Sequence, residues 1–293
     1  MKTENTYQTL IFYTYRTIEF PEILMERERA VWGVLGLRGR MIIAEEGING
    51  TLEGTVENTE IYIKHIQSDK RFKYMKIKKS PSGGDTFPRI SIKIREEIVG
   101  THFPKHIDPR VKTAEHITAK QLHKKFEKNE NFVIVDMRNS YEIESGRFQG
   151  SIDPRMEASR ELPEKIEYIK AEAAGRPIVT VCTAGVRCEK MSALLLDSGI
   201  ENVYQLEDGI HGYIQAYPQG YFEGTLFTFD DRLTMDFTKD REIIGVCKRC
   251  PNKSEDYFNC ATCHELCIIC DSCAVSDNTA YCSSDCEVVA VAK

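Results

Sequence analysis

The sequence predicts a multidomain protein of the α/β and α+β classes, and three observations indicate this fold class. Residues 7–100 have the pattern strand, helix, strand, strand, helix, strand, which is the order of a ferredoxin-like fold. Residues 117–217 alternate buried strands with helices, which is typical of a parallel sheet. Nine of the eleven cysteines fall within residues 247–286, which indicates a small Cys-rich, zinc-binding domain.

The first domain contains segments with the apolar runs or alternation of β-strands. QTLIFYTY and RGRMIIA are expected strands, and KYMKIKKS and RISIKIREEIV alternate as strands do. EEGINGTLEG contains Asn49-Gly50, a dipeptide that favours a tight turn between two strands. SPSGGDTFP, residues 80–88, is rich in Pro, Ser and Gly and predicts a loop between the last two strands.

Two helices are expected in the same domain because apolar residues recur at helical spacing. FPEILMERERAVWGVLGL is the first, and its apolar candidates are Ile23, Leu24, Val31, Leu35 and Leu37. TVENTEIYIKHIQSDK is the second, with Ile61, Ile63 and Ile66 on or near one face.

A linker at residues 101–116 precedes the second domain, whose first helix is TAKQLHKKFEK. Thr118 is expected to cap this helix, with Gln121 as its capping-box partner. NFVIVD and PIVTVC are buried strands, and ELPEKIEYIKAEAAG and EKMSALLLDSG are helices, the first of them with Gly175 at its end. NVYQLEDGIHGYIQAY supplies a short strand and a final helix. In such a sheet ligands bind at the carboxyl ends of the strands.

The expected domain boundaries follow from these patterns. Residues 1–104 form the ferredoxin-like or acylphosphatase-like domain, residues 112–224 the parallel α/β domain, and residues 236–293 the Cys-rich domain. The first of these domains is a candidate for nucleic-acid binding because of its charge.

The net charge is −6, but the charges are unevenly distributed. Residues 64–112 hold 13 Lys and Arg against 5 Asp and Glu, whereas residues 201–293 hold 7 against 16. The basic stretch is either a solvated face or a nucleic-acid contact, since Lys and Arg displace phosphate counterions. The sequence shows no signal peptide and no apolar run of about 20 residues, so we expect a cytoplasmic location and no membrane partner.

The segment VCTAGVRCEK, residues 181–190, places a thiol where a strand ends and a helix begins. Backbone N–H groups of a tight turn at that point can form an anion-binding nest, and the helix N-terminus favours a thiolate at Cys182. Gly185 permits the sharp turn, and Arg187 adds a fixed positive charge. The alternative is a buried structural cysteine, but these features together favour a reactive Cys182.

The pattern C-x-x-G-x-R between a strand and a helix resembles the active-site loop of rhodanese domains. Asp136, Arg138 and Glu142 resemble the rhodanese D-x-R…E segment. FQGSI (148–152) resembles the H-x-x-G-A-x segment, and LEDGIHGY (206–213) resembles the L-x-G-G segment. In rhodaneses the loop cysteine becomes a persulfide, so residues 112–224 are expected to form a rhodanese-like catalytic domain.

Longer motifs are similar to those of the rhodanese-containing tRNA wobble-uridine hydroxylases. CTAGVRCEK is similar to their CTGGIRCEK loop, IAEEGINGTLEG to AxEGINGT, and VDMRNSYEIESGRFQGSI to DxRNxYExxxGxFxGAI. SIKIREEIV and FDDRL also fit, and the similarity extends from about residue 8 to 286. In this sequence Ala184 and Val186 replace a Gly and an Ile of the family loop, so the loop shape is expected to differ slightly.

The resemblance implies an oxygen-dependent oxidoreductase that converts the wobble uridine in the anticodon loop of tRNA to 5-hydroxyuridine. It implies that Cys182 is catalytic and that the other active-site loop residues are Thr183, Ala184, Gly185, Val186, Arg187 and Cys188. Two roles of the thiolate stay open: it adds to C6 of uridine, or it carries an oxidised sulfur species to the base.

Other residues near this loop have two interpretations each. Cys188 is either a resolving thiol or a helix-packing cysteine, and Asp136 and Arg138 either orient the loop or form a stabilising ion pair. The sequence has no Gly-rich fingerprint of a flavin or nicotinamide site, and no spacing of its seven histidines supports an iron site with two histidines and a carboxylate.

The Cys-rich segment contains four closely spaced pairs, CKRC, CATC, CDSC and CSSDC. Their thiols belong to Cys247, Cys250, Cys260, Cys263, Cys270, Cys273, Cys282 and Cys286. Eight thiolates suit two structural zinc sites, because four protein ligands leave no open position. One zinc with spare thiols and a set of disulfides are the alternatives. Several pairings are open, among them first with third and second with fourth, and Cys267 and His264 are extra.

Three functions are compatible with these features. A tRNA uridine 5-hydroxylase uses O2 as co-substrate, holds the anticodon loop with the basic first domain, and accounts for the whole chain. A rhodanese-type sulfurtransferase would carry a persulfide on Cys182 but leaves the first domain unexplained. A non-catalytic interaction module would predict that Cys182 is dispensable. The hydroxylase is preferred, and the oligomeric state and the electron source stay open.

Overall fold

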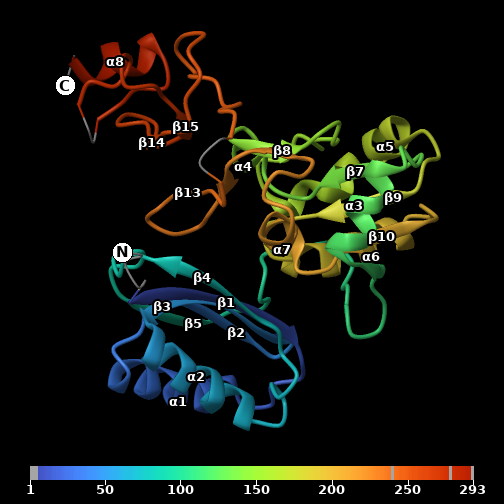
Figure 1. Ribbon diagram of the computed structural model, residues 1–293, viewed down its shortest axis with the longest axis vertical. Coiled ribbons are helices and arrows are strands. Elements are labelled where there is room, and N and C mark those ends of the chain that lie inside the picture. Colours follow the sequence, from blue (N-terminus) through green and yellow to red (C-terminus); the bar gives the residue numbers. More distant parts are fainter. Residues whose placement is uncertain (1–5, 239–240, 277–278, 292–293) are drawn as a thin grey trace. The chain divides into compact units, whose positions relative to one another are not determined.

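The computed structural model describes residues 6–238, 241–276 and 279–291 (Figure 1). By its internal contacts the chain divides into two compact units. Unit 1 is Met1–Ala114 with Val186–Asp197, and unit 2 is Glu115–Gly185 with Ser198–Lys293. The three domain ranges expected from the sequence stay a prediction.

Unit 1 contains a five-stranded sheet with the strand order β4-β1-β3-β2-β5. The strands are β1 (Tyr7–Tyr15), β2 (Arg38–Ala44), β3 (Gly47–Thr55), β4 (Ile77–Ser82) and β5 (Ile90–Ile94). Strand β3 runs antiparallel to β1 and β2, whereas β5 pairs in parallel with β2 at the edge. The first four strands have the ferredoxin-like order, which confirms the predicted class, and β5 extends the sheet.

Helices α1 (Pro21–Val34) and α2 (Val56–Ser68) lie on one face of this sheet (Figure 1). Trp32 and Tyr62 meet between them in an edge-to-face contact of 5.9 Å and form the centre of the core with Phe12. The predicted apolar faces were partly wrong, since Ile23 is 65% and Ile61 45% exposed.

The buried stripe of each helix uses other residues than those two isoleucines. Leu24 and Trp32 are buried on α1, and Tyr62 and Ile66 on α2. In each case the buried residues follow the helical period and include an aromatic ring, and the two exposed isoleucines lie off that face.

The turn predicted at Asn49-Gly50 is wrong, because both residues lie inside β3 and the chain reverses before Gly47. Asn49 Nδ2 donates a hydrogen bond to the carbonyl of Ile98 at 3.0 Å. A Cβ on Gly50 would lie 2.6 Å from the ring of Phe12, so this glycine makes room for a core aromatic side chain. Here packing within the sheet outweighs the local turn preference.

Helix α6 (Val186–Asp197) also belongs to unit 1, and nine of its twelve residues are buried. Three of these nine are the charged residues Arg187, Glu189 and Lys190. Buried charges need ionic or hydrogen-bonding partners, so this helix must be held by polar contacts as well as by apolar packing.

Unit 2 contains a parallel four-stranded sheet, as the alternation of strands and helices predicted. Its strands are β6 (Glu115–Ile117), β7 (Val133–Asp136), β9 (Ile178–Val181) and β10 (Val203–Leu206), in the order β6-β10-β9-β7. Its helices are α3 (Ala119–Glu127), α4 (Ser140–Ile143), the 3-10 turn η1 (Ser159–Glu161), α5 (Leu162–Ala173) and α7 (Gly209–Ala216). The predicted capping box of Thr118 and Gln121 is confirmed at the start of α3.

The remainder of unit 2 contains short two-stranded antiparallel sheets and one helix. Strand β8 (Gly146–Phe148) pairs with β11 (Phe222–Gly224), β12 (Leu226–Phe227) with β13 (Thr234–Met235), and β14 (Tyr257–Asn259) with β15 (Leu266–Ile268). Helix α8 (Ser284–Val291) follows. Among the described residues, no helix combines the length and apolar character that a bilayer crossing requires.

Candidate active site and metal centres

Cys182 follows the last residue of β9 at the carboxyl edge of the parallel sheet. Val181 pairs with Asp136 of β7, and the N–H of Met137 donates to the carbonyl of Val181 at 2.8 Å. Cys182 itself is fully buried. The thiol therefore lies where parallel α/β sheets place their ligands.

The backbone around Cys182 is held by the first turn of α7. The N–H of Ile210 donates to the carbonyl of Cys182 at 2.9 Å, and the N–H of His211 donates to that of Thr183 at 3.0 Å. The N–H of Gly185, whose φ is +101°, points back at Cys182 Sγ at 3.2 Å. A donor aimed at sulfur favours the thiolate over the thiol, so this turn can stabilise a nucleophilic or redox-active sulfur.

Gly209 fits directly against this turn. Its φ is +64°, and a Cβ there would lie 2.6 Å from the carbonyl oxygen of Cys182 and 2.8 Å from the nitrogen of Gly185. The sequence analysis gave Gly209 no role. Its match to the last Gly of the L-x-G-G segment is the feature that could have identified it. Only glycine allows α7 to approach the cysteine so closely.

Asp136 and Arg138 form a fully buried bidentate ion pair in unit 2. Arg138 Nε lies 2.9 Å from Asp136 Oδ1, and Nη2 lies 2.7 Å from Oδ2. The same guanidinium donates to the carbonyls of Glu142 and Gly146 at 3.0 and 2.7 Å. These contacts tie the end of β7 to α4 and β8. The two interpretations of the pair, as loop-orienting residues or as a stabilising ion pair, stay predictions.

Glu142 completes the same segment as a helix cap. The N–H of Asn139 donates to Glu142 Oε1 at 3.0 Å, which satisfies a free donor at the start of α4. The other residues of the predicted loop, Val186, Arg187 and Cys188, form the first turn of α6 in unit 1, where Arg187 is 6% exposed and Cys188 is fully buried. The proposed resolving role of Cys188 stays a prediction.

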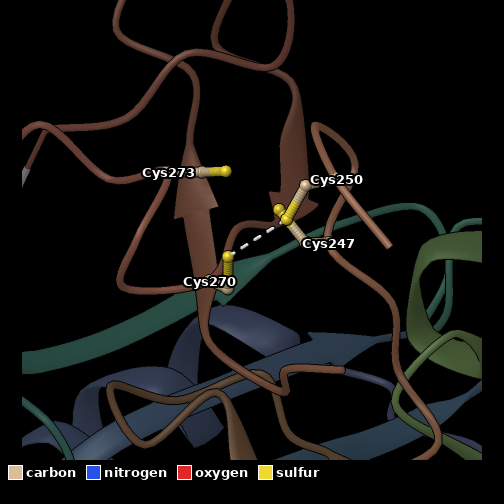
Figure 2. A group of neighbouring side chains, drawn as sticks. All are labelled: Cys247, Cys250, Cys270 and Cys273. Atoms are coloured by element: carbon tan, nitrogen blue, oxygen red, sulfur yellow. Dashed lines mark hydrogen bonds between the residues drawn. The ribbon is translucent and has the colours of Figure 1, made fainter. Parts of the chain in front are cut away.

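The Cys-rich segment gathers its eight paired thiols into two groups of four. One group is Cys247, Cys250, Cys270 and Cys273, and the other is Cys260, Cys263, Cys282 and Cys286. Figure 2 shows the sulfur atoms of the first group turned toward one another. The first pair thus lies with the third and the second with the fourth, which is the interleaved pairing among those left open.

The β14–β15 hairpin explains this pairing. CATC follows β14 at the closed end of the hairpin, whereas CDSC follows β15 at its open end, because the two strands are antiparallel. Three strand residues separate the ends by about 10 Å, too far for one ion to bind both pairs. Each pair must therefore find its partner in a segment outside the hairpin.

The donor sets fit a tetrahedral cation. Sulfur atoms 2.3 Å from one zinc ion lie about 3.8 Å apart in a tetrahedron. The observed distances are 3.5 Å for Cys250–Cys270 and for Cys263–Cys282, and 3.6 Å for Cys282–Cys286. All ligand atoms within a group lie within 4.8 Å of one another. Each group could therefore hold one metal ion without rearrangement of the backbone.

Hydrogen bonds favour the thiolate at one cysteine, and neighbouring thiols disfavour it at another. The Ser272 hydroxyl, 3.1 Å from Cys270 Sγ, together with nearby thiols lowers the pKa of Cys270 to about 6. In the same group the neighbouring thiols, Cys250 first, raise the pKa of Cys273 to about 12. Four thiolates cannot coexist at this distance without a cation, and a coordinated metal ion removes that conflict.

The two extra candidates lie outside both groups. Cys267 is buried in β15, and burial raises the pKa of its thiol to about 11. His264 occupies a left-handed turn with φ of +63°, and its N–H donates to the carbonyl of Cys260 at 2.9 Å. Its role there is to close the turn between two ligands.

Fold and site together define a protein with an acylphosphatase-like domain, a rhodanese domain and a Cys-rich extension. Family models match these parts: the UPF0176 acylphosphatase like domain matches residues 7–98, the Rhodanese-like domain 118–216, and Rhodanase C-terminal 223–287. The rhodanese range includes both Cys182 and α6.

Curated relatives specify the family further. The tRNA uridine(34) hydroxylase of Staphylococcus aureus (strain COL) is 38% identical over 258 residues, which cover 87% of this chain and 81% of the relative. That of Oceanobacillus iheyensis is 37% identical over 264 residues, 89% of this chain and 81% of the relative. Among solved structures, the Alr3790 protein from Anabaena sp. is 20% identical and covers 37% of this chain and 91% of its own, with a TM-score of 0.32. The chain belongs to the tRNA uridine(34) hydroxylase family.

Proposed function

We propose that this protein hydroxylates the wobble uridine of tRNA to 5-hydroxyuridine, with O2 as co-substrate and Cys182 as the catalytic residue. The observation that carries the proposal is the position of Cys182. It is the residue that follows a parallel strand, its backbone is fixed by α7, and its sulfur accepts a hydrogen bond from Gly185, in a chain 38% identical to named tRNA uridine(34) hydroxylases. The activity makes the protein an oxidoreductase.

The chemistry assigned to the chain centres on one sulfur atom. The Gly185 N–H, at 3.2 Å, stabilises negative charge on Cys182 Sγ. A thiolate there either adds to C6 of the uridine ring or carries an oxidised sulfur species to C5. The wobble base lies in a single-stranded loop, so little energy is needed to bring it out of its stack.

The basic stretch of the N-terminal domain supports tRNA as the partner. Lys73 lies 5.3 Å from the ring of Tyr74, which is 82% exposed, and the two offer a charge and an aromatic face to solvent. Lysines bind phosphates and aromatic rings stack on unpaired bases, so this part of the surface suits an anticodon loop. A tRNA substrate also favours a cytoplasmic location.

We further propose that residues 236–293 form a structural domain with two zinc ions, one in each group of four cysteines. Four thiolates leave no open coordination position, so neither ion would take part in catalysis. Residues 1–104 and 112–224 are proposed as the tRNA-holding and catalytic domains.

The test is nucleoside mass spectrometry of tRNA from cells that lack this gene and any redundant pathway. Wild type, Cys182→Ser and Cys267→Ala are each returned to these cells. Cys267 is a buried thiol outside both metal groups, so Cys267→Ala serves as the matched cysteine control. We expect 5-hydroxyuridine-derived nucleosides with wild type and Cys267→Ala, and none with Cys182→Ser.

Persistence of the modified nucleosides without the gene would overturn the hydroxylase. The sulfurtransferase alternative is measured in parallel with a thiosulfate–cyanide assay on the purified full chain. Robust sulfur transfer that needs Cys182, together with unchanged tRNA, would make the persulfide carrier the better assignment.

A further inference from the structure

We propose that Tyr15 and Lys190 are positioning residues for the Cys182 turn, and that they act through helix α6. The inference rests on the proposed function only where tRNA modification is measured. Neither residue has a role in the sulfur chemistry described above. Their contacts, and the place of α6 in the chain, carry the proposal.

Helix α6 is the direct continuation of the turn that carries the thiol. It begins at Val186, the residue after Gly185, whose N–H lies 3.2 Å from Cys182 Sγ. One peptide bond therefore connects the donor to the helix. The φ and ψ of Gly185 are the two rotations between its N–H and α6, so we expect a displacement of the first turn of α6 to move the donor.

The first anchor of α6 comes from strand β1. The Tyr15 hydroxyl donates to the carbonyl of Val186 at 3.2 Å, and the Tyr13 hydroxyl donates to Glu189 Oε1 at 3.1 Å. Tyr13 and Tyr15 point to one face of the sheet, because side chains alternate along a strand. Leu10 and Phe12 point to the other face, into the core that contains residues of α1 and α2.

The second anchor is a buried ammonium group. Lys190 is 2% exposed, and its Nζ lies 2.8 Å from Glu46 Oε2 and 2.9 Å from Glu97 Oε1. Glu46 also accepts the N–H of Ile98 at 2.8 Å, so the carboxylate is held from two sides. An ion pair fixed in this way defines both the position and the rotation of the helix.

Additional contacts hold the same helix in unit 1. Thr113 Oγ1 donates to Glu189 Oε2 at 3.0 Å, and the N–H of Ala114 donates to Ser192 Oγ at 3.2 Å. The far end of α6 is held differently, since Asp197 pairs with the exposed Lys105 and Lys112 at the surface. Exposed pairs of that kind hold a helix weakly, so the strong anchors are those near the cysteine turn.

The experiment measures the reactivity of Cys182 in the metal-loaded full chain. Wild type, Tyr15→Phe, Lys190→Met, Lys190→Arg and the control Asp197→Asn are alkylated with iodoacetamide over a series of pH values. Trypsin cleaves after Arg187, so the peptide of residues 171–187 contains Cys182 as its one cysteine. Its alkylated fraction is measured by mass spectrometry, and the melting temperature of each variant is recorded.

We expect Tyr15→Phe and Lys190→Met to move the alkylation midpoint to higher pH and to lower the rate at pH 7 by about threefold or more, because the Gly185 N–H no longer points at the sulfur. Lys190→Arg keeps the positive charge, so we expect its alkylation midpoint and rate to lie between those of Lys190→Met and wild type. Asp197→Asn is expected to match wild type. The modified fraction of tRNA in complemented cells should fall in the same order.

Two results would overturn the proposal. One is an alkylation profile of Tyr15→Phe that coincides with that of wild type, since this variant loses one hydroxyl group and nothing else. The other is an equal shift in Asp197→Asn, which would indicate general loosening of α6. Failure of the proposed function shows separately, as modified tRNA that persists with Cys182→Ser, and leaves the thiol measurement valid.

Discussion

Lys190 Nζ lies 2.8 Å from Glu46 Oε2, and this ion pair joins two sequence motifs that are 144 positions apart. Glu46 belongs to EEGINGT, and Lys190 is the last residue of CTAGVRCEK. Glu189 and Lys190 of the second motif, which the sequence predicted to begin a helix, therefore make their contacts within unit 1. The sequence identifies these residues, but their interaction partners depend on which strands pack against α6.

Replacement of Gly209 by alanine should disrupt the cysteine turn. The new Cβ would lie 2.6 Å from the carbonyl of Cys182, in addition to the strain of a φ of +64°. We expect a loss of stability of about 2–4 kcal/mol and loss of tRNA modification. Urea unfolding and nucleoside analysis measure the two effects.

Gly175→Ala is the control for backbone strain, since Gly175 has a φ of +75° with open space around its Cβ position. We expect this variant to lose about 1 kcal/mol and to keep its activity. Equal effects of the two substitutions would show that close approach of α7 to the turn is unimportant.

Arg138→Met should destabilise the protein by about 3 kcal/mol or more, because it leaves the buried Asp136 carboxylate without its cationic partner. Arg110→Met is the matched control, since Arg110 forms the same i, i+2 bidentate pair with Asp108 at a partly exposed position. We expect about 0–1 kcal/mol for that surface pair. Urea unfolding compares the two, and similar losses would contradict a special role of burial.

Stability near pH 4 should depend on Glu97. Burial by itself raises the pKa of Glu97, but hydrogen bonds from the N–H of His102 and from Lys190 outweigh it and lower the pKa below its ordinary value of 4.5. The unfolded chain then binds the proton more readily, so the stabilisation is complete above pH 4.5 and is lost as the pH falls through the folded pKa.

Glu97→Gln should therefore lower stability at pH 7 and flatten its decline under acid. Urea unfolding at a series of pH values between 3 and 7 measures this. A variant curve parallel to that of wild type would show that Glu97 does not contribute to the acid sensitivity.

The purified full chain should contain two zinc ions, measured by elemental analysis. Cys263→Ser removes a ligand of the second group and is expected to leave about one ion per chain, because three thiolates bind zinc less tightly than four. Cys267→Ala should keep both ions, since Cys267 lies outside the groups. Loss of both ions in Cys263→Ser would show that the two sites fold as one.

Three of the sequence expectations succeeded for local reasons. The capping box at Thr118, the strand that ends before Cys182 and the paired thiol spacing each depend on residues within a few positions of one another. Short-range hydrogen bonds and chain geometry determine such features. The turn at Asn49-Gly50 failed because a distant ring, that of Phe12, occupies the space a Cβ would need.

By itself the sequence determined the order of strands and helices, the thiol at a strand end and the eight candidate metal ligands, because these are properties of adjacent residues. The tertiary structure decided how deeply identical local motifs are buried. D-x-R forms an ion pair at Asp69–Arg71, Asp108–Arg110, Asp136–Arg138 and Asp230–Arg232, but only the third of these four pairs is completely buried. It likewise decided which cysteine pairs meet and which strand holds α6, since burial and long-range pairing arise only when separate segments pack together.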